Sequence, residues 1–321
     1  MTDTLALVFP GQGSQQVGML RELAERYSVV RTTFEEASGA LGYDLWNIVQ
    51  EGPAEALNAT ACTQPALLAS SVAIWRVWQE LEGPRPAVMA GHSLGEYSAL
   101  VCAGAIGFAE GVRLVRLRGE AMQAAVPEGE GAMAAVLGLD DSAVEQACRD
   151  AAQNEVVAAV NYNAPGQVVI AGHRAAVERA IGLCQEAGAK RALPLPVSVP
   201  SHCTLMTPAA ERLLEGIQAI DIKAPRYRVV QNVDARSHDD NVDILTTRLV
   251  EQLYQPVRWT QCVEHMVEGG AQVFIECGPG KVLTGLGKRI NRQVKGLAVN
   301  DPESLAAALE LARENIAEDN K

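Results

Sequence analysis

The sequence has no apolar run of the length that a membrane-spanning helix requires, and residues 1–4 lack the basic and apolar segments of a secretory signal. It has no C-x-x-C spacing, which argues against a zinc ribbon, and its odd number of cysteines, seven, argues against a disulfide framework. We therefore expect a cytoplasmic protein that holds no metal and does not enter the membrane. Its cysteines should be mostly buried thiols.

An excess of positive charge is also absent. The formal net charge is −12, whereas proteins that bind nucleic acid need a basic face for the phosphates. The sequence thus argues against a nucleic-acid partner. Two local basic patches still stand out, and their members are Lys190, Arg191, Lys281, Lys288, Arg289 and Arg292. Such patches are either solvated surface charge or contact points for an acidic partner.

The chain is long enough for one large domain and a smaller one, with 321 residues of which 48% are hydrophobic. Residues 128–198 alternate as strand, helix, strand, strand, helix, strand, with Gly138 and Gly188 at two of the joints. This βαββαβ order is typical of a ferredoxin-like unit. We predict a large α/β domain built from residues 1–127 and 199–321, with the smaller subdomain inserted at 128–198.

The segment 91–95, Gly-His-Ser-Leu-Gly, has the G-x-S-x-G form that places a serine hydroxyl on a tight turn between a strand and a helix. The flanking residues are small because the turn is cramped. An apolar run at 87–90 suits the strand, and residues 96–103 have helix-forming character. The motif predicts that Ser93 is the nucleophile of an enzyme that handles acyl groups.

A serine nucleophile needs a base, because its hydroxyl is not ionised near neutral pH. His202 lies where the inserted unit returns the chain to the main domain, and such junctions commonly hold the sites of α/β proteins. We take it as the candidate base. We expect the other histidines to shape the site or to be structural or exposed: His92, His173, His238 and His265. No acid between Ser93 and His202 stands convincingly at the end of a main-sheet strand, so a carboxylate-assisted triad has weak support.

Arg118 stands on a helix expected over residues 108–126. Its neighbours three and four residues away are all apolar: Leu114, Val115, Ala121 and Met122. An arginine on an apolar stripe is rarely buried without an anionic partner. Arg118 is therefore either a snorkelling or structurally paired side chain, or a fixed fork that binds a substrate carboxylate through two hydrogen bonds.

Acyl transfer also needs hydrogen-bond donors for the oxyanion that forms on the thioester or ester carbonyl. The amide of Leu94, directly after the serine, is one candidate. Gln12, in the Gly-Gln-Gly loop after an expected strand at 5–9, is another, although that loop can also be an ordinary turn. The loop does not match G-x-G-x-x-G because residue 16 is Gln, which disfavours a dinucleotide site.

Taken together and in order, these segments resemble the malonyl-CoA:acyl-carrier-protein transacylases of bacterial fatty-acid synthesis. The resemblance covers essentially the whole chain and rests on the Arg118 helix and on five segments, FPGQGSQ at 9–15, GHSLGE at 91–96, VPSH at 199–202, NVD at 232–234 and GPGK at 278–281. It implies a hydrolase-like α/β core with a mostly parallel sheet and an inserted ferredoxin-like subdomain. It also implies ping-pong transfer of a malonyl group to the phosphopantetheine thiol of acyl carrier protein.

The resemblance implies that Ser93 attacks the thioester and that His202 acts as general base and then as general acid. It places a main-chain carbonyl at Gln252 against the histidine, which accounts for the missing triad acid. Such a neutral carbonyl stabilises an imidazolium less than a carboxylate does, which a reactive thioester tolerates. Fatty-acid and polyketide pathways, and strictness for malonyl over methylmalonyl, stay open.

The same resemblance implies that Arg118 holds the malonyl carboxylate and that the Gln12 and Leu94 amides form the oxyanion hole. No cofactor is implied, because the coenzyme A thioester is a substrate and phosphopantetheine belongs to the carrier. We expect a monomer whose partners are malonyl-CoA and acyl carrier protein. The carrier is acidic, so the candidate docking residues are the basic ones: Lys190, Arg191, Lys288 and Arg289.

Two other functions compete with this interpretation. A serine esterase or thioesterase would use water to resolve the acyl-enzyme, and it predicts an acid partner for His202. A non-catalytic scaffold that only binds the carrier would leave Ser93, His202 and Arg118 unexplained.

Overall fold

The structure is a computed structural model that describes residues 4–197 and 199–319. Its larger sheet has five strands in the order β7-β2-β1-β8-β9, and every pairing within it is parallel. The strands are β1 (Leu5–Phe9), β2 (Val88–Gly91), β7 (Arg228–Val230), β8 (Val273–Cys277) and β9 (Lys295–Val299). Each residue of β1, β2 and β8 is buried, as expected for strands covered on both faces. The predicted α/β class with a mostly parallel sheet is confirmed.

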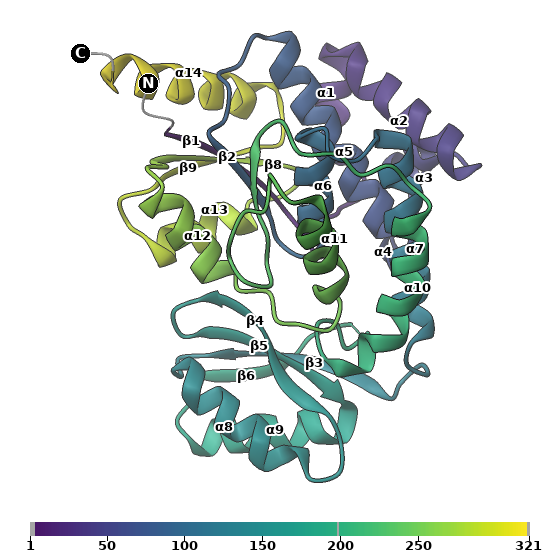
Figure 1. Ribbon diagram of the computed structural model, residues 1–321, viewed down its shortest axis with the longest axis vertical. Coiled ribbons are helices and arrows are strands. Elements are labelled where there is room, and N and C mark those ends of the chain that lie inside the picture. Colours follow the sequence, from purple (N-terminus) through teal and green to yellow (C-terminus); the bar gives the residue numbers. More distant parts are fainter. Residues whose placement is uncertain (1–3, 198, 320–321) are drawn as a thin grey trace.

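The smaller sheet is antiparallel and has the strand order β4-β5-β3-β6. Its strands are β3 (Gly131–Leu137), β4 (Val157–Ala164), β5 (Gln167–His173) and β6 (Arg191–Pro194). Helices α8 (Asp141–Ala152) and α9 (Arg174–Glu186) cover one face of it (Figure 1). In chain order this unit runs β3-α8-β4-β5-α9-β6, the predicted βαββαβ order.

The predicted boundaries, 1–127, 128–198 and 199–321, stay a prediction. Residues 1–3, 198 and 320–321, which this division also assigns, lie outside the described residues.

The remaining helices surround the larger sheet (Figure 1). They are α1 (Arg21–Arg26), α2 (Ser28–Leu41), α3 (Leu45–Glu51), α4 (Ala54–Asn58), α5 (Thr60–Glu80), α6 (Leu94–Cys102), α7 (Phe108–Ala124), α10 (Thr207–Gln218), α11 (Val242–Glu251), α12 (Trp259–Glu268), α13 (Val282–Ile290) and α14 (Pro302–Asp319), with a short 3₁₀ helix at Thr204–Met206. Among the described residues, no helix combines the length and the apolarity needed to cross a bilayer. The seven cysteines are free thiols, and six of them are buried.

The parallel arrangement determines where the site lies. Because β1, β2, β7 and β8 are parallel neighbours, the loops that follow them meet at one edge of the sheet. Gln12 follows β1, Ser93 follows β2 and Asn232 follows β7. The smaller sheet reaches the same edge, because Asn161 of β4 forms a bridge with Val257. Segments far apart in sequence therefore come together around the serine.

Candidate active site

Ser93 occupies a strained turn between β2 and α6. Its backbone has φ 52° and ψ −109°, a positive φ that side-chain-bearing residues rarely adopt. A Cβ atom at Gly91 would lie 1.8 Å from the carbonyl carbon of Gly95, and one at Gly95 would lie 2.0 Å from the carbonyl oxygen of Phe9. No larger residue fits at either position. The prediction that small residues flank the serine because the turn is cramped is confirmed.

His202 meets this serine directly. Its Nε2 lies 2.8 Å from Ser93 Oγ, and its Nδ1 lies 2.6 Å from the main-chain carbonyl oxygen of Gln252. The carbonyl can only accept, so Nδ1 carries the proton and Nε2 is free to take one from the serine. In the described part of the chain, no carboxylate is hydrogen-bonded or ion-paired to His202. The acid partner that a triad esterase predicts is thus replaced by a neutral carbonyl.

Burial shifts the histidine toward its neutral form. His202 is 3% exposed, and its desolvation, together with the nearby charge of Arg118, lowers its pKa to about 3. A neutral imidazole at physiological pH is the form that can act as a general base. The arrangement can therefore activate Ser93 without a prior deprotonation of the histidine.

Arg118 points at the same oxygen from α7. Its side chain is 1% exposed, and Nη2 donates hydrogen bonds to Ser93 Oγ (3.2 Å) and to Gln252 Oε1 (3.0 Å). Its Nη1 donates to Gln64 Oε1 (3.0 Å), and the guanidinium lies 5.2 Å from the centre of the Tyr97 ring. These direct partners are neutral, and its Nε has no partner in the described residues. A buried cation held by amides beside a nucleophile can bind a substrate carboxylate.

The two candidate oxyanion donors also lie at this turn. Leu94 is the first residue of α6, and the N–H groups of a first helical turn have no partner within their helix. The loop after β1 packs against the same turn, because a Cβ at Gly11 would lie 2.6 Å from the carbonyl oxygen of His92. Gln12, the next residue, is exposed. Leu94 thus stands at the helix N-terminus, where negative charge is favoured, and Gln12 directly follows the glycine that packs against the turn.

The structure adds supporting residues that the sequence interpretation gave no role. Asn232 Oδ1 accepts the Ser93 N–H (2.8 Å), and its Nδ2 donates to the carbonyl of Gly91 (2.8 Å), so this side chain clamps both sides of the turn. His92 points away from the serine, with its Nε2 2.7 Å from Asn163 Oδ1 of β4. Its role in shaping the site stays a prediction. The sequence signal that could have identified Asn232 is its position directly after β7, in one of the loops that meet around the serine.

Comparison with known proteins agrees with this geometry. A family model described as acyl transferase domain matches residues 6–314. The malonyl CoA-acyl carrier protein transacylase of Escherichia coli (strain K12) is 60% identical over 306 residues, which cover 95% of this chain and 99% of the relative. The chain belongs to the malonyl CoA-acyl carrier protein transacylase family. The transacylase of the same name from Bacillus subtilis (strain 168) is 47% identical over 311 residues, 97% of this chain and 98% of the relative.

Solved structures of this transacylase family share the fold. An acyl carrier protein S-malonyltransferase from Vibrio cholerae superimposes with a TM-score of 0.92 at 62% identity, covering 95% of this chain and 99% of that one. A malonyl-transacylase in complex with a type II PKS acyl-carrier protein gives a TM-score of 0.94 at 58% identity, covering 96% and 99%.

Two of the basic docking candidates of this transacylase lie at one end of the smaller sheet. Leu137, the last residue of β3, pairs with Arg191 of β6 on one side and with Gln167 of β5 on the other. The main-chain N–H of Lys190 donates to the Leu137 carbonyl (2.8 Å). The side chains of Lys190 and Arg191 are exposed. Both are therefore free to meet a partner at this end of the sheet.

The other two candidates reach the same end from α13. Lys288 and Arg289 stand in the last turn of that helix, both exposed, and Arg289 Nη1 donates to Gln167 Oε1 (2.7 Å). Gln167 opens β5 directly across the hairpin from the end of β4, where Asn163 contacts His92. The four basic residues thus lie near the hairpin that joins β4 to β5. The same hairpin contacts His92, the neighbour of Ser93, through Asn163.

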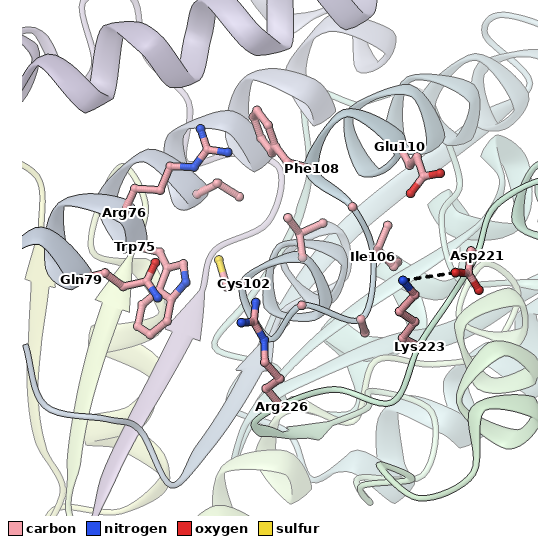
Figure 2. A pocket seen from close by; sticks show the side chains of 15 residues that line it. Trp75, Arg76, Gln79, Cys102, Ile106, Phe108, Glu110, Asp221, Lys223 and Arg226 are labelled. Atoms are coloured by element: carbon pink, nitrogen blue, oxygen red, sulfur yellow. Dashed lines mark ion pairs between the residues drawn. The ribbon is translucent and has the colours of Figure 1, made fainter.

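A separate cavity of about 490 Å³ opens at the far end of α6 from the serine (Figure 2). Trp75 of α5 and Cys102 of α6 line its buried floor, and Lys223 stands at its rim, 3.3 Å from Asp221. None of its lining residues belongs to the serine site. The cavity is therefore distinct from the place where the acyl group would bind.

Proposed function

We propose that this protein transfers a malonyl group from malonyl-CoA to the phosphopantetheine thiol of acyl carrier protein, through a malonyl ester of Ser93. The observation that carries the proposal is the convergence on one oxygen, Ser93 Oγ, of a neutral base and a buried cation. A hydrolase needs only the base. A fork of fixed positive charge beside the nucleophile adds recognition of an acyl group that ends in a carboxylate.

In the first half-reaction His202 Nε2 takes the proton of Ser93 as Oγ attacks the thioester carbonyl. The amides of Leu94 and Gln12 stabilise the oxyanion of the tetrahedral intermediate. The intermediate collapses by breaking the carbon–sulfur bond, and the leaving coenzyme A sulfur takes the proton from His202. Ser93 then carries the malonyl group as an ester.

In the second half-reaction the same groups work in reverse. His202, again neutral, takes the proton of the carrier's thiol, and the sulfur attacks the ester carbonyl of malonyl-Ser93. When the carbon–oxygen bond breaks, His202 returns the proton to Ser93 Oγ. The Gln252 carbonyl keeps the imidazole oriented through both halves.

We further propose that the enzyme works as a cytoplasmic monomer without a resident cofactor or metal. Every side chain in the scheme comes from one chain, and the scheme moves only protons and an acyl group. The seven free cysteines fit a reducing compartment.

Intact-mass spectrometry of an acyl-enzyme chase tests the proposed reaction. Wild-type protein mixed with malonyl-CoA should gain one malonyl group, and carrier protein that bears phosphopantetheine should then discharge it far faster than buffer does. Carrier protein without phosphopantetheine is the control and should leave the adduct in place. Discharge by water at the same rate would make the protein an esterase. Absence of both adduct and turnover would leave only a scaffold.

The docking surface, Lys190, Arg191, Lys288 and Arg289, gives a second test of the carrier step. Reversing charge in the variant Lys190→Glu/Arg191→Glu should lower kcat/KM for the carrier about 10-fold at low salt and weaken its salt dependence. Transfer to free pantetheine should not change, because a small thiol needs no docking surface. Arg85→Glu, which alters an exposed arginine in the segment between α5 and β2, is the matched control. Equal losses with both acceptors would refute the docking role.

A further inference from the structure

Glu96 is a fully buried carboxylate that the proposed mechanism does not use. It lies in the first turn of α6, three residues after the nucleophile, and is 0% exposed. Its Oε1 accepts a hydrogen bond from Gln231 Nε2 (3.0 Å), and its Oε2 accepts from the Asn232 N–H (2.8 Å) and from Gln252 Nε2 (2.9 Å). None of the ion pairs in the described residues includes it.

Stability does not account for this residue. An acid in a first helical turn gains from the helix dipole, but only fractions of a kcal/mol to about 1 kcal/mol. Against this, burying a carboxylate without an ion-pair partner is costly. Desolvation raises the pKa of Glu96 to about 7 although three donors and the charge of Arg118 act in the opposite direction. The ionised form of Glu96 is therefore less favourable in the folded protein than in the unfolded chain.

Two of the three donors, Asn232 and Gln252, connect Glu96 to the base, to Arg118 and to the serine turn. Gln252 Nε2 donates to Glu96 and to the Ser93 carbonyl (3.0 Å), and Gln252 Oε1 accepts from Arg118. The main-chain carbonyl of the same Gln252 accepts from His202. Asn232, whose N–H binds Glu96, clamps the serine turn through its side chain. Glu96 is thus linked to His202 and Arg118 through Gln252, and to the serine turn through Asn232.

The chemistry of a carboxylate explains why this position matters. An ionised carboxylate only accepts hydrogen bonds, so the end of the Gln252 amide that faces Glu96 must be the NH₂ group. The oxygen end then has to face Arg118, which only donates. An uncharged side chain at position 96 would weaken this constraint, because only the Ser93 carbonyl and Arg118 would then favour the observed orientation of the amide. The Gln252 amide would be held less firmly, and with it the acceptor that it offers to Arg118.

We propose that Glu96, in its ionised form, is a positioning residue that orients Gln252 and through it both Arg118 and His202. The proposal rests on the proposed function, because it assigns Glu96 to malonyl transfer. It predicts that the reaction requires the ionised form of Glu96. Removing the charge should lower the rate of malonyl transfer more than that of acetyl transfer, since only malonyl uses the Arg118 fork.

The variant Glu96→Gln tests this with little change in shape. We expect kcat/KM for malonyl transfer to fall about 10- to 100-fold, and the malonyl-to-acetyl ratio to fall at least several-fold. Glu276→Gln is the matched control, because Glu276 is also 0% exposed and accepts hydrogen bonds only at the start of α13, from Leu283 and Thr284. It should lose stability and keep the wild-type ratio.

The pH dependence separates positioning from a purely structural role. Wild-type malonyl transfer should rise with pH through a midpoint near 7, and Glu96→Gln should lack this step. His202 does not produce it, because its pKa is lowered to about 3. The other ionisable groups facing Glu96 are Arg118, Tyr97 and Cys262, and burial raises the pKa values of Tyr97 and Cys262, which keeps both protonated through this range. The step therefore belongs to Glu96.

Thermal stability gives an independent readout of the same group. A carboxyl whose pKa is raised in the folded protein stabilises it at low pH and loses that contribution as pH rises through the folded value. The Tm of the wild type, relative to that of Glu96→Gln, should therefore fall between pH 5 and pH 8. A structural role predicts a lower Tm for the variant at both pH values.

An unchanged malonyl-to-acetyl ratio together with an unchanged pH profile in Glu96→Gln would overturn the proposal. If that variant does not fold, Glu96→Asp decides, because it keeps the charge and shortens the reach. Glu96→Asp should lower the rate of malonyl transfer at high pH and retain the rise of that rate with pH. Loss of this rise in Glu96→Asp would count against the proposal. Failure of the wild type to form a malonyl adduct would instead refute the proposed function itself.

Discussion

Replacing Ser93 with alanine should abolish the malonyl adduct and lower transfer to the carrier by about 10⁴-fold or more. The hydroxyl lies between the base and the cation, with His202 Nε2 at 2.8 Å and Arg118 Nη2 at 3.2 Å. Without it no ester forms, so the ping-pong route is closed. Residual turnover would come from binding and oxyanion stabilisation alone. Intact mass after mixing with malonyl-CoA, and a carrier-transfer assay, measure both effects.

Ser98→Ala, on the helix α6 that follows the serine turn, is the control for this substitution. Ser98 is fully buried, and its Oγ has no hydrogen-bond partner in the described residues, so alanine there removes an unpaired hydroxyl and no hydrogen bond. We expect wild-type transfer and an unchanged adduct. A malonyl adduct that persists in Ser93→Ala would identify a different nucleophile and overturn the scheme.

The parts of this molecule that could be predicted from sequence are those encoded in contiguous segments. The G-x-S-x-G turn requires small residues at Gly91 and Gly95 for steric reasons that involve only neighbouring backbone and the adjacent strand. The βαββαβ order of the smaller sheet follows from local periodicity. His202 could be selected because it stands at the junction between the inserted unit and the main domain.

The supporting contacts could not be predicted in the same way, because they depend on how distant segments meet. Asn232 reaches Ser93 from 139 positions away, and Gln252 reaches its carbonyl from 159. The position of Asn232 after a strand, and the resemblance at Gln252, placed both residues near the site, but neither indicated what the two side chains contact. Glu96 has a local explanation, the helix dipole, and this conceals its contacts with three residues from two distant segments.

For Arg118, the local sequence pattern predicted burial but not the groups that hold the guanidinium. Its apolar neighbours correctly indicated burial, and they left two alternatives: a snorkelling or structurally paired arginine, or a fork for a substrate carboxylate. In the structure the guanidinium is held by Gln64, Gln252 and the serine hydroxyl. Neutral amides fix the orientation of the fork without neutralising its charge, which stays available for an incoming carboxylate. A direct ion pair with a protein acid would have competed with that substrate.

Replacing Arg118 with alanine should therefore reverse the preference between two acyl groups. We expect kcat/KM for malonyl transfer to fall about 10²- to 10⁴-fold, because a buried carboxylate without its charged partner is strongly disfavoured. Acetyl transfer should fall much less, since acetyl has no carboxylate to leave unpaired. A mixture of equal malonyl-CoA and acetyl-CoA, analysed by the mass of the acyl-enzyme, reports the ratio directly.

Two further variants show what part of the arginine matters. Arg118→Lys keeps the charge but not the planar fork, so it should restore only part of the malonyl preference. Arg116→Ala, two residues away on α7, removes a half-exposed arginine that pairs with Glu120 at 2.9 Å, and it should leave both activities within about 2-fold of wild type.

The ratio matters more than either rate, because Arg118 also donates to Ser93 Oγ. Its loss can alter the nucleophile itself, and that effect is common to every acyl group. Acetyl transfer measures this shared part, so the additional loss seen only with malonyl isolates recognition of the carboxylate. An equal fall in both reactions would mean that the arginine serves the nucleophile alone, and the carboxylate fork would have to be sought elsewhere in the site.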